Sequence, residues 1–265
     1  MQSRIRKWLE QGEVDVFIAY MEQDGHVLPH VFTRDNLEEC AGLHAGVERY
    51  PLEVMAMELA AEDPELKIGI LARDCTTRAL NVLETWNQLN QDRIRSLQVS
   101  CCPSSLRDHA RCSYLDPEPC GEVKASQGID SHAGTQEVES LGQDELFARW
   151  HYEFSKCIKC YGCRDICPVC FCRECSLENP DLIHTGQQLT EVPLFHLVRA
   201  VHMAGRCIDC GLCEEACPMD IPLRLLYRKV NEIVVQTFDY RTGVDKGTPP
   251  LNILGSEVTL ETASL

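Results

Sequence analysis

One run of cysteines occurs twice in this chain and limits what its second half can fold into. The first copy reads Cys157-Ile-Lys-Cys160-Tyr-Gly-Cys163-Arg-Asp-Ile-Cys167-Pro168, and the second reads Cys207-Ile-Asp-Cys210-Gly-Leu-Cys213-Glu-Glu-Ala-Cys217-Pro218. Both follow the spacing C-x2-C-x2-C-x3-C-P, which in bacterial ferredoxins binds a 4Fe–4S cluster. Two complete copies, each closed by proline, favour a pair of such clusters over a zinc knuckle.

The spacing also predicts how the eight cysteines are shared. Three cysteines on a tight loop can aim at three corners of one cube, whereas the fourth faces away and, in two-cluster ferredoxins, binds the other cube. We therefore expect one cluster on Cys157, Cys160, Cys163 and Cys217. We expect the second cluster on Cys207, Cys210, Cys213 and Cys167.

The composition indicates a cytoplasmic protein whose cysteines bind metal. The chain has 265 residues, enough for two domains, and 17 cysteines, an odd number that excludes complete disulfide pairing. Residues 1–10 are charged and lack the apolar centre of a signal peptide, and no apolar run reaches the roughly 18 residues of a membrane span. The net charge of −16 argues against nucleic acid as a partner.

The first hundred residues alternate strand and helix patterns. Apolar runs typical of strands lie at 14–21, 67–72 and 93–100, and helical patterns lie at 36–40, 51–61 and 76–89. This rhythm predicts a small parallel-sheet α/β domain over residues 1–100.

The rest of the chain divides into three further regions. Residues 101–145 are rich in Pro, Gly, Ser and acids and are predicted to be a cysteine-containing loop and linker. Residues 146–238 are predicted to be a two-cluster, bacterial-ferredoxin-like α+β domain with a helical insert. The insert helix covers about 191–204, with Leu194, Leu197, Val198 and Val201 on one face, and a second helix covers 221–238. Residues 239–265 are predicted to be an extended C-terminal tail.

Eight cysteines outside the two motifs are candidates for an additional centre. Cys170, Cys172 and Cys175 follow the first motif and either line its cluster pocket or bind a further metal. Cys101, Cys102, Cys112 and Cys120 follow the last predicted strand, and Cys75 lies at the end of another. Because ligands gather at the carboxyl ends of parallel strands, this set predicts a third iron–sulfur cluster or a zinc site. The alternative is buried free thiols.

Five segments carry a family resemblance. They resemble the beta subunits of deazaflavin-reducing hydrogenases and formate dehydrogenases, and more closely the iron–sulfur relatives associated with heterodisulfide-reductase-like complexes. The segments are 156–175, 195–207, 217–226, 69–80 and 87–97. The resemblance implies an electron-transfer subunit from an anaerobe, inside a larger flavin and iron–sulfur complex. It also implies that FAD is a possible cofactor, because some members bind FAD and reduce the deazaflavin coenzyme or accept electrons from ferredoxin.

Two departures from the family favour electron relay over catalysis. The cysteine motifs here follow the α/β region, whereas they generally precede it in coenzyme-reducing beta subunits, and the α/β region is short. The chain also has no G-x-G-x-x-G or Walker motif and no evident general acid or base. We predict a subunit that relays single electrons through two 4Fe–4S clusters between flavin and iron–sulfur partner subunits of heterodisulfide-reductase-like, hydrogenase or formate dehydrogenase type, or ferredoxin. The alternative is an FAD-binding beta subunit that exchanges a hydride with a soluble deazaflavin or nicotinamide coenzyme.

Overall fold

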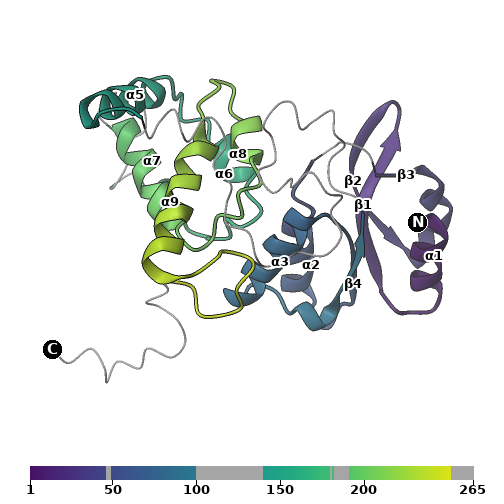
Figure 1. Ribbon diagram of the computed structural model, residues 1–265. Helices are drawn as coiled ribbons and strands as arrows, with labels where there is room; N and C mark the ends of the chain where they lie inside the picture. Colours follow the sequence, from purple (N-terminus) through teal and green to yellow (C-terminus); the bar gives the residue numbers. More distant parts are fainter. Residues whose placement is uncertain (46–48, 100–139, 180, 182–190, 252–265) are drawn as a thin grey trace.

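Two halves of the chain lie side by side in the computed structural model (Figure 1). A sheet with flanking helices forms the first half, and short and long helices form the second. The structure describes residues 1–45, 49–99, 140–179, 181 and 191–251.

A five-stranded mixed sheet organises the first half. Its order is β2-β1-β4-β5, and the short β3 (Leu43–His44) pairs with β1. Three strands run parallel: β4 (Ile68–Ala72) pairs with β1 (Val16–Gln23) on one side and with β5 (Ile94–Gln98) on the other. β2 (His26–Thr33) and β3 are antiparallel to β1. The predicted α/β class is confirmed, but the sheet is not purely parallel.

The antiparallel hairpin was missed although a local signal for it exists. Asp24 and Gly25 join β1 to β2, and both have left-handed backbone angles, φ 53° and φ 77°. An Asp-Gly pair between apolar runs is a strong sign of a two-residue hairpin turn. β2 lies at the edge of the sheet, where Pro29 is tolerated because one side of the strand needs no partner.

In the described part of the first half, three α-helices and two 3-10 helices flank the sheet. These are α1 (Gln2–Glu10), η1 (Arg34–Gly42), α2 (Leu52–Glu62), α3 (Asp74–Thr85) and η2 (Gln91–Arg93). Phe17, Ile68 and Ile70 are fully buried in the core between sheet and helices. Gly69 of β4 is required there, because a Cβ at this position would lie 2.3 Å from the Phe17 ring.

The second half consists of helices around the two cysteine motifs. They are α5 (Gln143–Ser155), α6 (Gly162–Asp165), α7 (Glu191–His202), α8 (Leu212–Glu215) and α9 (Leu223–Phe238). The helices predicted at 191–204 and 221–238 correspond to α7 and α9. The helix α5 was not predicted, and it begins inside the region interpreted as linker. No helix that the structure describes is long and apolar enough to cross a membrane.

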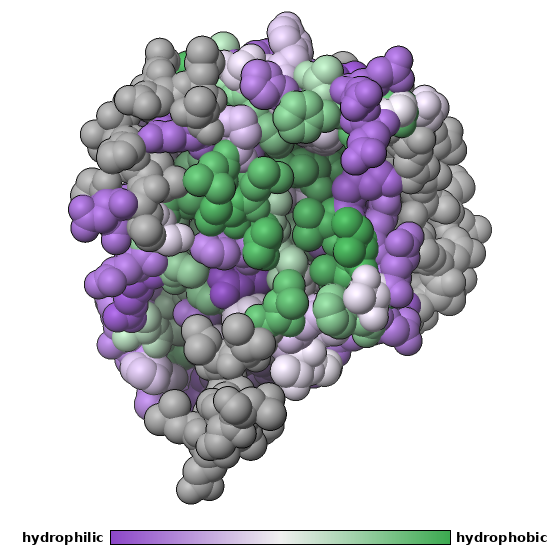
Figure 2. All heavy atoms as spheres, turned by 90° about the vertical axis from the view of Figure 1, so that its left-hand side faces the viewer, coloured by the Kyte–Doolittle hydropathy of each residue, from purple (hydrophilic) through white to green (hydrophobic). Residues whose placement is uncertain are grey.

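The apolar face predicted for the insert helix points outward. Leu194, Leu197 and Val201 are exposed, whereas Val198 is partly buried against the core that contains the motif cysteines. The buried side of α7 combines the apolar Phe195 with the polar His196 and Arg199, and it packs beside the cysteine loops. Figure 2 shows apolar side chains gathered on this outer face of the molecule. The residues around its hollow come from α5, α7 and α9 and include Phe147, Trp150, Leu197 and Leu226.

Helix α3 joins the two halves. Ala79 and Val82 of α3 pack in the core that contains the motif cysteines. The Arg206 guanidinium lies 3.9 Å from the Trp86 ring centre and 4.5 Å from the Phe171 ring centre. These contacts hold α3 against the second half.

Candidate metal centre

Two cavities in the second half are each lined by four motif cysteines. The first, of about 330 Å³, is lined by Cys157, Cys160, Cys163 and Cys217. The second, of about 360 Å³, is lined by Cys167, Cys207, Cys210 and Cys213. Each cavity thus takes three cysteines from one motif and one from the other, which is the grouping expected from the spacing.

The backbone of both motif loops is shaped in the same way. Lys159 and Tyr161 have φ of 52° and 59°, and the matching Asp209 and Gly211 have φ of 53° and 82°. Alternation of left-handed and right-handed residues turns successive N–H groups toward one concave side, a shape that binds anions and occurs at many iron–sulfur sites. Gly162 is close to the first cavity, because a Cβ there would lie 3.6 Å from Cys160 Sγ.

Burial makes the free thiols of both cavities hard to ionise. It raises the pKa of Cys163 to about 11 and that of Cys207 to about 12, and it raises the pKa of Cys210 and Cys213 well above the usual value. Thiolates in such a place need compensating positive charge, which bound iron supplies.

Backbone donors already point at the sulfurs. The N–H of Lys159 donates to Cys157 Sγ at 3.4 Å, and the N–H of Asp209 donates to Cys207. Among the described residues, no group of three or more Cys, His, Asp or Glu is arranged around a single metal ion, since each quartet surrounds a cavity instead. The donor set therefore fits an iron–sulfur cube.

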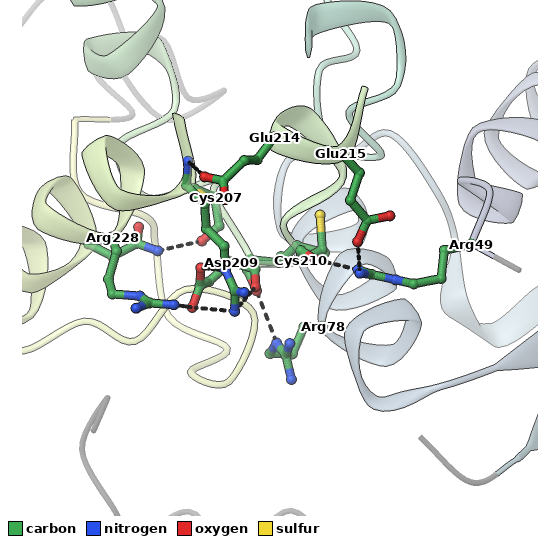
Figure 3. Close-up of polar contacts among 11 residues, drawn as sticks. Arg49, Arg78, Cys207, Asp209, Cys210, Glu214, Glu215 and Arg228 are labelled. Carbon is green, nitrogen blue, oxygen red and sulfur yellow. Dashed lines mark hydrogen bonds and ion pairs between the residues drawn. The ribbon is translucent and has the colours of Figure 1, made fainter. Parts of the chain in front are cut away.

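A shell of arginines holds the second loop (Figure 3). Asp209, inside the loop, is 2 % exposed and lies 2.7 Å from Arg224 Nε and 3.4 Å from Arg228 Nη2. The loop carbonyls are also bound: Arg78 donates to Ile208 O at 3.3 Å, Asn231 donates to Cys207 O at 2.9 Å, and Arg49 donates to Cys210 O. Arg49 and Arg78 come from the sheet half, so both halves position this loop.

The first loop is held by residues of its own half and is nearer to solvent. Lys159, at the position of Asp209, pairs with Glu191 of α7 at 3.1 Å. The Tyr161 hydroxyl donates to Leu177 O at 2.9 Å. Cys160 and Ile158 are exposed, whereas Ile208, the counterpart of Ile158, is buried.

Two buried side chains of α7 were not recognised from the sequence. His196 borders the first cavity and stacks on Phe154 with ring centres 4.7 Å apart. Arg199 borders the second cavity and donates to Cys163 O at 2.8 Å. In the sequence, only the helical spacing of Val192, Phe195, His196 and Arg199 indicates this face. The apolar pattern is weak because two of these four residues are polar.

The remaining candidate cysteines do not form a third group within the described residues. Cys170 Sγ lies 3.6 Å from Arg199 Nη1, and Cys172 Sγ lies 3.5 Å from Arg206 Nη1. Cys75 packs at the edge of the core with the second quartet, and Cys175 packs at the edge with the first motif. The other four candidates, Cys101, Cys102, Cys112 and Cys120, lie outside the described residues.

Comparisons with known proteins find a family model that matches the second motif and relatives that are similar over longer parts of the chain. The 4Fe-4S binding domain family matches residues 200–222, which contain Cys207, Cys210, Cys213 and Cys217. The F420-dependent formate dehydrogenase 1 subunit beta of Methanococcus maripaludis is 48% identical over 176 residues, 62% of this chain and 45% of that protein. The F420-dependent formate dehydrogenase subunit beta of Methanocaldococcus jannaschii is 45% identical over 103 residues, 39% of this chain and 27% of that protein.

A more distant match involves another multi-subunit enzyme. The acetyl-CoA decarbonylase/synthase complex subunit alpha 1 of Methanosarcina mazei is 27% identical over 150 residues, 55% of this chain and 16% of that protein. In every case the matched part spans less than half of the relative's length. The chain thus carries a 4Fe–4S binding domain, and the predicted resemblance to beta subunits of deazaflavin-dependent formate dehydrogenases is confirmed over the parts that match.

Proposed function

We propose that this chain is an electron-relay subunit that holds two 4Fe–4S clusters. Cys157, Cys160, Cys163 and Cys217 would bind one cluster, and Cys167, Cys207, Cys210 and Cys213 would bind the other. The observation that carries the proposal is the pair of cavities, each lined by four cysteines drawn from both motifs. A bound cluster supplies a site that accepts and releases one electron at a time.

The chain's own residues hold, shield and neutralise the clusters. Ile208 and Tyr227 exclude water from the second cavity, and Phe195 and Ile221 do so at the first. Backbone N–H groups and the cations near the loops offset negative charge on the thiolates. No proton transfer is required of any side chain, which suits a relay.

The partners we propose are other flavin or iron–sulfur subunits of an oxidoreductase complex. The exposed Cys160 and Ile158 place the first cavity near the surface, where a partner can exchange electrons with it. The apolar face of α5, α7 and α9 is the kind of surface that isolated soluble proteins rarely expose, and it supports assembly with another subunit. The relatives named as formate dehydrogenase subunits support the same type of complex.

Metal analysis of anaerobically purified protein tests the proposal. We expect about 8 irons and about 8 acid-labile sulfides per chain. Cys210→Ala and Cys160→Ala should each reduce both values to about 4, because each change removes one ligand of a different cluster. A colourless protein without labile sulfide, or variants with undiminished iron, would contradict the proposal. FAD released on denaturation would instead support the hydride-exchanging alternative.

A further inference from the structure

Arg199 is a buried cation placed at the second cavity. It lies on α7, is 2 % exposed and borders the cavity of Cys167, Cys207, Cys210 and Cys213, but not the first cavity. Its Nη2 donates to Cys163 O at 2.8 Å, which fixes the guanidinium beside the segment that links the first quartet to the second. Its Nε is buried and has no hydrogen-bond partner in the structure.

No carboxylate of the described residues forms an ion pair with Arg199. Its polar contacts include Cys163 O, Cys170 Sγ and the Cys167 side chain, and its guanidinium lies 5.8 Å from the Tyr227 ring centre. An arginine stays charged in proteins, and a buried charge without a partner is costly. Negative charge on a cluster and its thiolates in the cavity that Arg199 borders would offset that cost.

The other charges around the two cavities largely cancel. At the second cavity, Arg224 and Arg228 face the two acids Asp209 and Glu214. At the first cavity, Lys159 is paired with Glu191 at 3.1 Å. Arg199 therefore stands out as a buried cation that lines the second cavity and has no carboxylate partner among the described residues.

We propose that Arg199 stabilises the reduced form of the cluster held by Cys167, Cys207, Cys210 and Cys213. This cluster then accepts an electron before the cluster held by Cys157, Cys160, Cys163 and Cys217. The inference rests on the proposed function. Reduction moves one electron from a donor, which is oxidised, onto the cluster, so it adds one negative charge. A fixed cation nearby favours that state through its Coulomb attraction.

EPR-monitored redox titrations of the full chain test this assignment. The samples are the wild type, Arg199→Gln and Arg199→Lys, and Cys210→Ala identifies which signal belongs to the second cluster. For Arg199→Gln we expect the ratio of reduced to oxidised second cluster at a fixed potential to fall about tenfold, or about 59 mV for a one-electron couple. Arg199→Lys, which keeps the charge, should restore most of this ratio. Arg93→Gln, which removes an arginine from η2 in the sheet half, should change neither cluster.

Separate outcomes overturn the inference and the proposed function. Unchanged potentials in Arg199→Gln would show that Arg199 does not stabilise the reduced cluster. Equal shifts in Arg199→Gln and Arg199→Lys would show that its effect does not come from its charge. If Arg199→Gln fails to assemble clusters, the order of reduction in the wild type tests the inference. Reduction of the second cluster before the first supports the inference, and the reverse order overturns it. A wild type without iron and labile sulfide would instead refute the proposed function.

Discussion

The two cysteine motifs have one spacing but two different surroundings. The first loop lies near solvent, with Ile158 45 % exposed, and its lysine pairs with a glutamate of the same half. The second loop is enclosed, with Ile208 2 % exposed, and arginines from both halves bind its carbonyls and its aspartate. The spacing of the cysteines thus determines where sulfurs gather, whereas the residues between and around them determine how each site behaves.

This difference indicates that the two sites have different roles in the proposed relay. The first site is accessible to a partner, and the second is insulated and held by arginines from both halves. Solvent exposure and nearby charge are among the factors that set cluster potentials. The following changes test whether the second loop is structurally more demanding than the first.

The largest effect is expected at the central charged residue of each loop. Asp209→Ala would leave Arg224 and Arg228 buried without their shared carboxylate, and we expect a loss of about 4 kcal/mol in unfolding free energy. The side chains of Lys159 and Glu191 are 9 % and 18 % exposed, so Lys159→Ala breaks a partly buried pair and should cost about 2 kcal/mol. Anaerobic thermal unfolding of the cluster-loaded proteins measures both values.

Equal losses in these two variants would contradict the comparison. Asp209→Asn serves as the control for shape, because it keeps the volume and removes the charge. We expect it to lie between the wild type and Asp209→Ala, since an amide oxygen still accepts from an arginine.

A smaller effect is expected at the isoleucine beside the first cysteine of each motif. Ile208→Ala removes a fully packed side chain between α3 and the second cavity and should cost about 3 kcal/mol. Ile158→Ala removes a half-exposed side chain and should cost less than about 1 kcal/mol. The same unfolding experiment applies, and a more sensitive Ile158 would mean that a partner or a neighbouring segment covers the first loop.

The sequence predicted the repeated parts of the molecule well. The cysteine spacing anticipated which four residues line each cavity, because it places three sulfurs on one loop and turns the fourth toward the other motif. The buried strand at Ile68–Ala72 and the helices at α3, α7 and α9 also followed from apolar patterns. The Asp24-Gly25 hairpin could have been predicted, but its edge strand contains Pro29 and alternates weakly, so it did not resemble a strand.

The parts that were not predictable depend on contacts between distant residues. The inward face of α7 contains His196 and Arg199, and a pattern based on hydropathy assigns such residues to solvent. The two arginines on Asp209 lie 15 and 19 residues further along the chain, and Arg78 lies 130 residues before the carbonyl that it binds. Charge complementarity of this kind is not visible in local sequence, because only the fold brings the partners together.

The last test concerns the contact that attaches α3 to the second half. Gly243 has φ 75°, and a Cβ there would lie 2.8 Å from Arg78 Cβ and 2.8 Å from Arg78 O. Gly243→Ala should therefore combine backbone strain with a clash and cost about 2 kcal/mol. Gly25→Ala is the matched control, because Gly25 has φ 77° with no atom within 4 Å, and it should cost about 1 kcal/mol.

Hydrogen exchange distinguishes where the two glycine variants loosen the fold. In Gly243→Ala, faster exchange should appear in α3 and in the loop 207–213, since Asn81 binds Gly243 O and Arg78 binds Ile208 O. The first loop, 157–163, should be unaffected because its partners Leu177, Glu191 and Arg199 lie elsewhere in the second half. Faster exchange in both loops would show that α3 supports the two sites equally, and the contrast between an insulated second site and an independent first site would no longer hold.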